Sequence, residues 1–70
     1  MPSFKVVHPD GSAARRTKVS ISFDGGAMAD GITDDRGYVS ISGSSTTGKI
    51  YVMGREVRRG SLNVSEVRIL

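Results

Sequence analysis

The sequence predicts an all-β fold, a small antiparallel β-sandwich of six to seven short strands with no helix. Several runs alternate apolar with polar residues, and turn-forming residues separate these runs at intervals of roughly 8–12 residues. No run has the apolar spacing of three and four that an amphipathic helix requires. Seventy residues suffice for one domain, so residues 1–70 are expected to form a single sandwich.

The first strand is expected at residues 4–7, with Phe4 and Val6 on one face. Pro9 cannot donate a hydrogen bond to a sheet, and the pair Asp10-Gly11 favours a turn. The strand therefore ends at this point, and residues 13–17 follow as a polar, basic connection.

The clearest strand is expected at residues 18–23, because apolar and polar side chains alternate there with a period of two. A turn at Asp24-Gly25-Gly26 ends it. Residues 27–33 are expected to form a weak strand, since Ala, Asp and Gly are poor strand formers.

The best-defined turn lies at residues 34–37, between the strands expected at 27–33 and 38–42. Asp35-Arg36 can occupy the centre of a type I turn, and Gly37 can supply the positive φ of a three-residue hairpin loop. The Asp34 carboxylate can accept hydrogen bonds from nearby backbone N–H groups. The two flanking strands are therefore expected to pair as a hairpin.

A second hairpin is expected around Met53-Gly54, which can form a two-residue turn. It joins a strand at 49–53 to a strand at 55–58, and residues 59–61 are expected to end the second strand. A polar loop at 43–48 precedes this hairpin.

The final run, residues 62–70, changes the side on which its apolar residues lie. Leu62 and Val64 share one face, whereas Val67 and Ile69 share the other. Either a bulge near Ser65-Glu66 turns both pairs inward, or a partner chain covers one face. A strand at an exposed edge can pair with another chain, although charged residues in and around this run could instead limit such pairing. The candidate association edge consists of Val67, Ile69 and Leu70.

Inward-facing positions of the expected strands define a candidate core. Its members are Val19, Ile21, Phe23, Val39, Ile41, Ile50 and Val52.

The chain has no cysteine and a single histidine, His8, so thiolate metal sites and disulfides are excluded. No G-x-S-x-G motif is present to supply a nucleophile for a catalytic triad. We therefore expect no enzymatic activity, no catalytic residue, no cofactor and no metal. The chain also has no apolar segment of signal-peptide or membrane length, so it is expected to be cytoplasmic and without a membrane partner, unless it is a domain of a longer secreted chain.

The net charge of +3 gives two alternatives for the basic residues. A solvated basic rim aids solubility, whereas a convergent patch could contact the phosphates of a nucleic acid. The candidate basic patch consists of Arg15, Arg16, Lys18, Arg55, Arg58 and Arg59.

Over nearly its whole length, the order of turns and strands resembles that of the carboxypeptidase-regulatory-like, or transthyretin-like, β-sandwiches. The motifs that carry the resemblance are Asp10-Gly11 before Val19-Ser20-Ile21, then Thr33-Asp34 with Gly37, then Tyr51-Val52. The resemblance implies a fold with many uses and transfers no catalytic residue. The expected function is a non-enzymatic interaction or structural module that binds an unidentified protein or a second copy of itself through the C-terminal edge strand. The alternative is a basic β-domain that binds nucleic acid.

Overall fold

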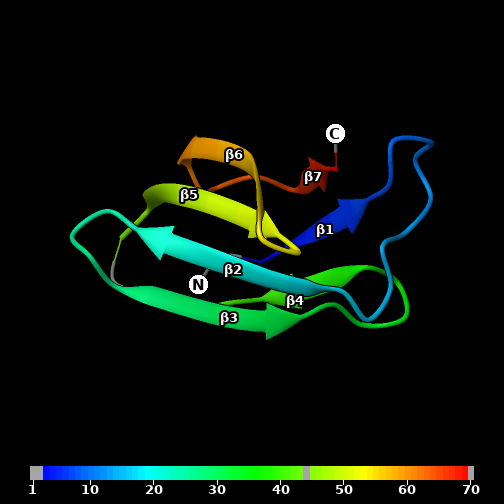
Figure 1. Ribbon diagram of the computed structural model, residues 1–70, viewed down its shortest axis with the longest axis horizontal. Coiled ribbons are helices and arrows are strands. Elements are labelled where there is room, and N and C mark those ends of the chain that lie inside the picture. The colour runs from blue at the N-terminus through cyan, green and yellow to red at the C-terminus, as the bar shows by residue number, and fades with distance from the viewer. Residues whose placement is uncertain (1–2, 44, 70) are drawn as a thin grey trace.

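The computed structural model describes residues 3–43 and 45–69, which form seven strands and no helix (Figure 1). One sheet has the strand order β4-β1-β7 and the other the order β3-β2-β5-β6. The prediction of a small all-β domain built from two sheets is confirmed. The strands are β1 (Ser3–Val7), β2 (Lys18–Phe23), β3 (Met28–Ile32), β4 (Tyr38–Ser40), β5 (Thr47–Val52), β6 (Arg55–Ser61) and β7 (Glu66–Arg68).

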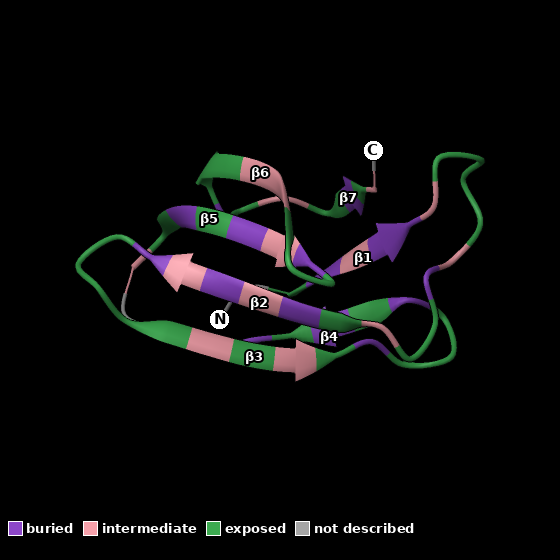
Figure 2. Ribbon diagram, in the orientation of Figure 1, coloured by how far each residue is buried: buried purple, intermediate pink, exposed green. Residues whose placement is uncertain are grey.

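The core lies between the two sheets, and all seven residues predicted for it are buried. Figure 2 shows the reason along β2, where buried positions alternate with partly buried ones. Phe4 and Val6 of β1 and Val67 of β7 supply the facing layer from the three-stranded sheet. Alternation of period two therefore located the inward faces of β2 and β5 correctly.

The strands pair antiparallel with one exception, because β1 and β7 run parallel with Val6 opposite Val67. The predicted strand at 62–70 is shorter than expected, and no bulge occurs at Ser65-Glu66. Residues 62–65 instead leave the strand conformation, which allows buried Leu62 and Val67 both to face the core despite the change of side. In the hairpin before it, β6 continues through the predicted break to Ser61.

Three turns share one hydrogen-bond pattern. In each, the N–H of a glycine at positive φ donates to the carbonyl three residues earlier: Gly11 to His8 (2.8 Å), Gly26 to Phe23 (3.1 Å) and Gly37 to Asp34 (3.1 Å). Positive φ at Met53 (52°) and Gly54 (82°) identifies the β5–β6 connection as a type I′ turn. The predicted turns at these places are confirmed.

The strands on either side of the turn at residues 34–38 do not pair with each other. β3 belongs to the four-stranded sheet and β4 to the three-stranded sheet. The predicted turn therefore forms, but the predicted hairpin pairing of its two strands is wrong. The side chain of Thr33 is the physical reason. Its buried hydroxyl donates to the carbonyl of Ala14 (2.6 Å) and accepts from the N–H of Thr17 (2.8 Å), which fixes the chain where it changes sheet.

Among residues 3–43 and 45–69, there is no helix with the length and apolar character needed to cross a membrane.

Gly37 should be the most sensitive turn residue, because it combines positive φ (84°) with close packing. A Cβ atom there would lie 2.7 Å from the Val6 carbonyl oxygen, whereas at Gly54 (φ 82°) it would meet nothing within 4 Å. Both Gly→Ala variants carry the left-handed strain, and Gly37→Ala should lose at least about 1 kcal/mol more of the free energy of unfolding. Urea denaturation measures the difference. Equal losses in the two variants would contradict the close approach of Gly37 to β1.

Candidate binding surfaces

Strand β3 forms an edge of the four-stranded sheet. It pairs with β2 on one side, with Ser20 opposite Asp30, and no described strand pairs with its other side (Figure 1). An edge of this kind presents unpaired N–H and C=O groups to other chains. The hydrogen-bond pattern between β2 and β3 determines which residues of β3 present these groups.

The ladder between β2 and β3 is fixed at both ends by hydrogen bonds. The N–H of Phe23 donates to the carbonyl of Ala27 (2.7 Å), and the N–H of Thr33 donates to the carbonyl of Thr17 (3.0 Å). Because only alternate residues of an antiparallel strand bond to a given neighbour, Ala29 and Gly31 bond to β2. The main-chain groups of the other three residues point to the open edge. These residues are Met28, Asp30 and Ile32.

The same three residues also carry the exposed side chains of β3. Met28 and Ile32 are 68% and 66% exposed, and no residue of β3 is buried (Figure 2). The inward positions hold the small residues Ala29 and Gly31. A Cβ atom at Gly31 would lie 2.9 Å from Val39 Cγ2, so the two sheets approach too closely there for a larger inward side chain.

Asp30 lies between the two apolar side chains. Its carboxylate is 3.8 Å from Lys18 Nζ, and both side chains are more than half exposed. An ion pair so exposed contributes little to stability, at most about 1 kcal/mol. The sequence contains a signal for this surface, apolar residues two positions on either side of an aspartate. The candidate residues predicted from sequence did not include these three, because the poor strand formers between them obscure the alternation.

The C-terminal strand lies at an edge of the described sheet, as predicted, but its residues Val67 and Ile69 pack toward the chain's own core. Val67 is 3% exposed, and Ile69 packs partly buried against the core. The expectation that the strand presents apolar groups on both faces is therefore wrong for these two residues. Leu70, the third residue of the candidate association edge, lies outside the described residues.

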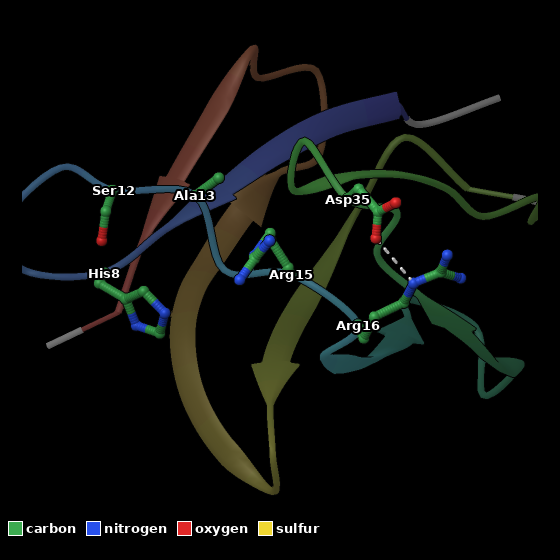
Figure 3. A pocket seen from close by; sticks show the side chains of 6 residues that line it. All are labelled: His8, Ser12, Ala13, Arg15, Arg16 and Asp35. Carbon is green, nitrogen blue, oxygen red and sulfur yellow. Dashed lines mark hydrogen bonds and ion pairs between the residues drawn. The ribbon is translucent and has the colours of Figure 1, made fainter.

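The first group of basic residues borders a hollow at the end of the sandwich that contains the turn at 34–38. The hollow measures about 700 Å³, and Figure 3 shows Arg16 turned toward Asp35, with Arg15 between that pair and His8. Arg16 has positive φ (51°), and its Nε donates to Asp35 Oδ1 at 3.0 Å. The full lining is His8, Ser12, Ala13, Arg15, Arg16 and Asp35.

The chemistry of this hollow is that of ion pairs and turns. The Ser12 hydroxyl donates to Asp10 Oδ1 (2.7 Å), so its proton is held by a carboxylate in the turn. The Asp35 carboxylate offsets the charge of Arg16. What remains is a polar depression with one arginine, Arg15, between its two sides.

The second basic group lies along β6, and its first member lies at the same end of the sheet as Lys18, because Arg55 is opposite Val52 and Val52 is opposite Val19. Arg59 lies opposite Lys49 of β5, and Lys49 lies opposite Ser22 of β2. Lys18 is four residues before Ser22 on β2, which separates the two by roughly 13 Å at the usual rise of a strand. Arg59 is 2.9 Å from Glu56 Oε2, and Arg58 donates to the carbonyl of Ser61. The register thus places Arg55 at the Lys18 end of the sheet and Arg59 farther along it. Arg16, Lys18 and Arg59 each pair with a carboxylate.

Comparisons of the chain with protein-family models, with curated proteins and with solved structures found no match. The resemblance to the transthyretin-like group therefore remains a prediction from sequence motifs.

Two aspartates in the turns, Asp34 and Asp10, have lowered pKa values and so make the stability of the fold depend on pH. The pKa of Asp34 is lowered because its carboxylate accepts hydrogen bonds from the N–H groups of Tyr38 and Arg36. The pKa of Asp10 is lowered chiefly by the hydroxyl and then by the N–H of Ser12. In both cases the folded state favours the ionised carboxylate more than the unfolded chain does.

The stability of the protein should therefore fall in acid. A carboxyl whose folded pKa lies below the unfolded value of 3.8 stabilises the fold above about pH 4, and this contribution disappears as the pH falls through the folded pKa. Asp34→Asn keeps an acceptor oxygen but does not titrate, so it should flatten the pH dependence of unfolding below about pH 4. Urea midpoints measured from about pH 7 to about pH 2 test this. An unchanged acid slope in the variant would contradict the role of Asp34.

Proposed function

We propose that the chain is a non-enzymatic interaction module that binds an extended segment of another polypeptide as an added strand on the open edge of β3. One observation carries the proposal. The three residues whose main-chain groups point to the open edge are also the residues whose side chains are exposed along it, Met28, Asp30 and Ile32.

Strand addition uses two kinds of contact, and β3 offers both. Main-chain hydrogen bonds to the open edge provide affinity for any extended segment, and contacts to alternate side chains provide selectivity. The two apolar side chains are exposed by about two thirds, so an added strand would remove apolar surface from water as it pairs. Both contributions come from the same three residues of the strand.

Two of the other edge strands, β7 and β6, give less support to binding. Val67 of β7 is buried in the chain's own core, and β6 carries Arg55, Arg58 and Arg59, the kind of charged residues that limit pairing at edges. The nucleic-acid alternative is also less well supported, since three of the six basic residues pair with carboxylates and their charge is thereby offset. We therefore place the binding function on β3.

Removing the apolar side chains of β3 should weaken strand addition without unfolding the protein. The probe is a synthetic peptide of alternating threonine and valine residues with one central lysine, and binding is followed by titration of backbone amide chemical shifts. The double variant Met28→Ser, Ile32→Ser should bind it roughly three- to tenfold more weakly, because two cross-strand side-chain pairs are lost. The amide shifts of β3 should respond most to the peptide in the unaltered chain.

The matched control is Met53→Ser, which removes an equally exposed methionine (68%) from the β5–β6 turn. This variant should bind the peptide as the unaltered chain does. The proposal is overturned if the peptide leaves the β3 amides unchanged at millimolar concentration, or if the double variant binds as tightly as the control.

A further inference from the structure

We infer that the strand which β3 accepts carries a lysine or arginine opposite Asp30, with an apolar residue two positions away on each side. This inference rests on the proposed function and names the chemistry of the partner. The added strand would have three residues on the outer face of the sheet, directly opposite Met28, Asp30 and Ile32. The middle position therefore faces a carboxylate, and the outer two positions face apolar side chains.

Charge complementarity at the middle position is the basis for this inference. The side chain of Asp30 is 57% exposed, and its neighbour on β2 is the uncharged Ser20. Among the described residues, its cationic partner is Lys18, at 3.8 Å and itself 66% exposed, which leaves most of the carboxylate accessible to a second donor. Opposite charges directly across a sheet attract, whereas like charges repel. A basic residue in the partner strand would therefore be preferred over an acidic one.

The same charge opposes a second copy of this chain as the partner. If β3 paired antiparallel with β3 of another copy about the centre of the strand, Asp30 would lie opposite Asp30. Moving the register by two residues would place Asp30 opposite Met28, but Ile32 would then lie opposite Gly26 in a turn. Pairing with a second copy would therefore either place two aspartates opposite each other or leave part of the β3 edge without a paired strand. Asp30 is a charged residue on an edge strand that selects against copies of its own chain while it attracts a basic partner.

A charge exchange tests this inference. Two peptides are compared, both of alternating threonine and valine, one with lysine and one with glutamate at the central valine-face position. The unaltered chain should bind the lysine peptide about three- to tenfold more tightly than the glutamate peptide. In the Asp30→Lys variant the preference should reverse. The control Glu66→Lys makes the same change of net charge on edge strand β7 of the other sheet, and it should retain the lysine preference.

The outcomes separate the inference from the proposed function. If neither peptide affects the β3 amides, strand addition itself fails. If both peptides bind at β3 with equal affinity, or if Asp30→Lys leaves the preference unchanged, the inference of a basic residue opposite Asp30 is overturned. The proposal of strand addition at β3 is then still supported. Sedimentation of the chain alone should show a monomer. A dimer whose formation protects the β3 amides would overturn the selection against self-pairing.

Discussion

The passage of the chain from one sheet to the other between Thr33 and Tyr38 determines how the rest of the sandwich is arranged. At its start, the Thr33 hydroxyl bridges the carbonyl of Ala14 and the N–H of Thr17 within the β1–β2 connection. At its end, the carbonyl of Gly37 accepts a hydrogen bond from the N–H of Val6 at 2.8 Å. The two contacts tie the turn to the β1–β2 connection at one end and to β1 at the other. The turn therefore directs β3 into one sheet and β4 into the other.

This arrangement has a direct consequence for binding. Two strands that would cover each other's edges in a hairpin become the outer strands of different sheets, so the outer edge of β3 has no described partner. The sheets approach closely beside Gly31, where Val39 and Ile41 pack, and this leaves room only for small side chains on the inner face of β3. Its larger apolar residues, Met28 and Ile32, are consequently on the outer face. The open edge and the exposed apolar side chains thus have one structural origin.

Much of the fold could be predicted from the sequence because it depends on local chemistry. The alternation in residues 18–23 identified the buried face of β2, and glycines between the strand-like runs identified the turns, including Gly37 and Gly54 at positive φ. What could not be predicted was which strands pair. The turn at 34–38 has the same local hydrogen bonds as the turn at 23–27, which does join paired strands. The difference depends on Thr33, whose buried hydroxyl bonds to a segment that the sequence identifies only as a basic connection.

The candidate sites show the same division between local and long-range information. The strand at the C-terminus was correctly placed at an edge, but its parallel pairing with β1 and the burial of Val67 depend on contacts across the whole chain. The position of each residue of the second basic group relative to Lys18 depends on the register of β5 and β6, which places Arg55 near Lys18 and Arg59 farther along the sheet. The exposed face of β3 follows from the small residues Ala29 and Gly31, which fit between closely packed sheets.

Amide hydrogen exchange of β3 in the unliganded chain tests the open edge most directly. The exchange rates should alternate along the strand: the N–H groups of Ala29 and Gly31 exchange slowly because they bond to β2. Those of Met28, Asp30 and Ile32 exchange at rates close to those of an unstructured chain. Slow exchange at all five residues would mean that another segment covers the edge, and this would contradict the open edge on which the proposed binding depends.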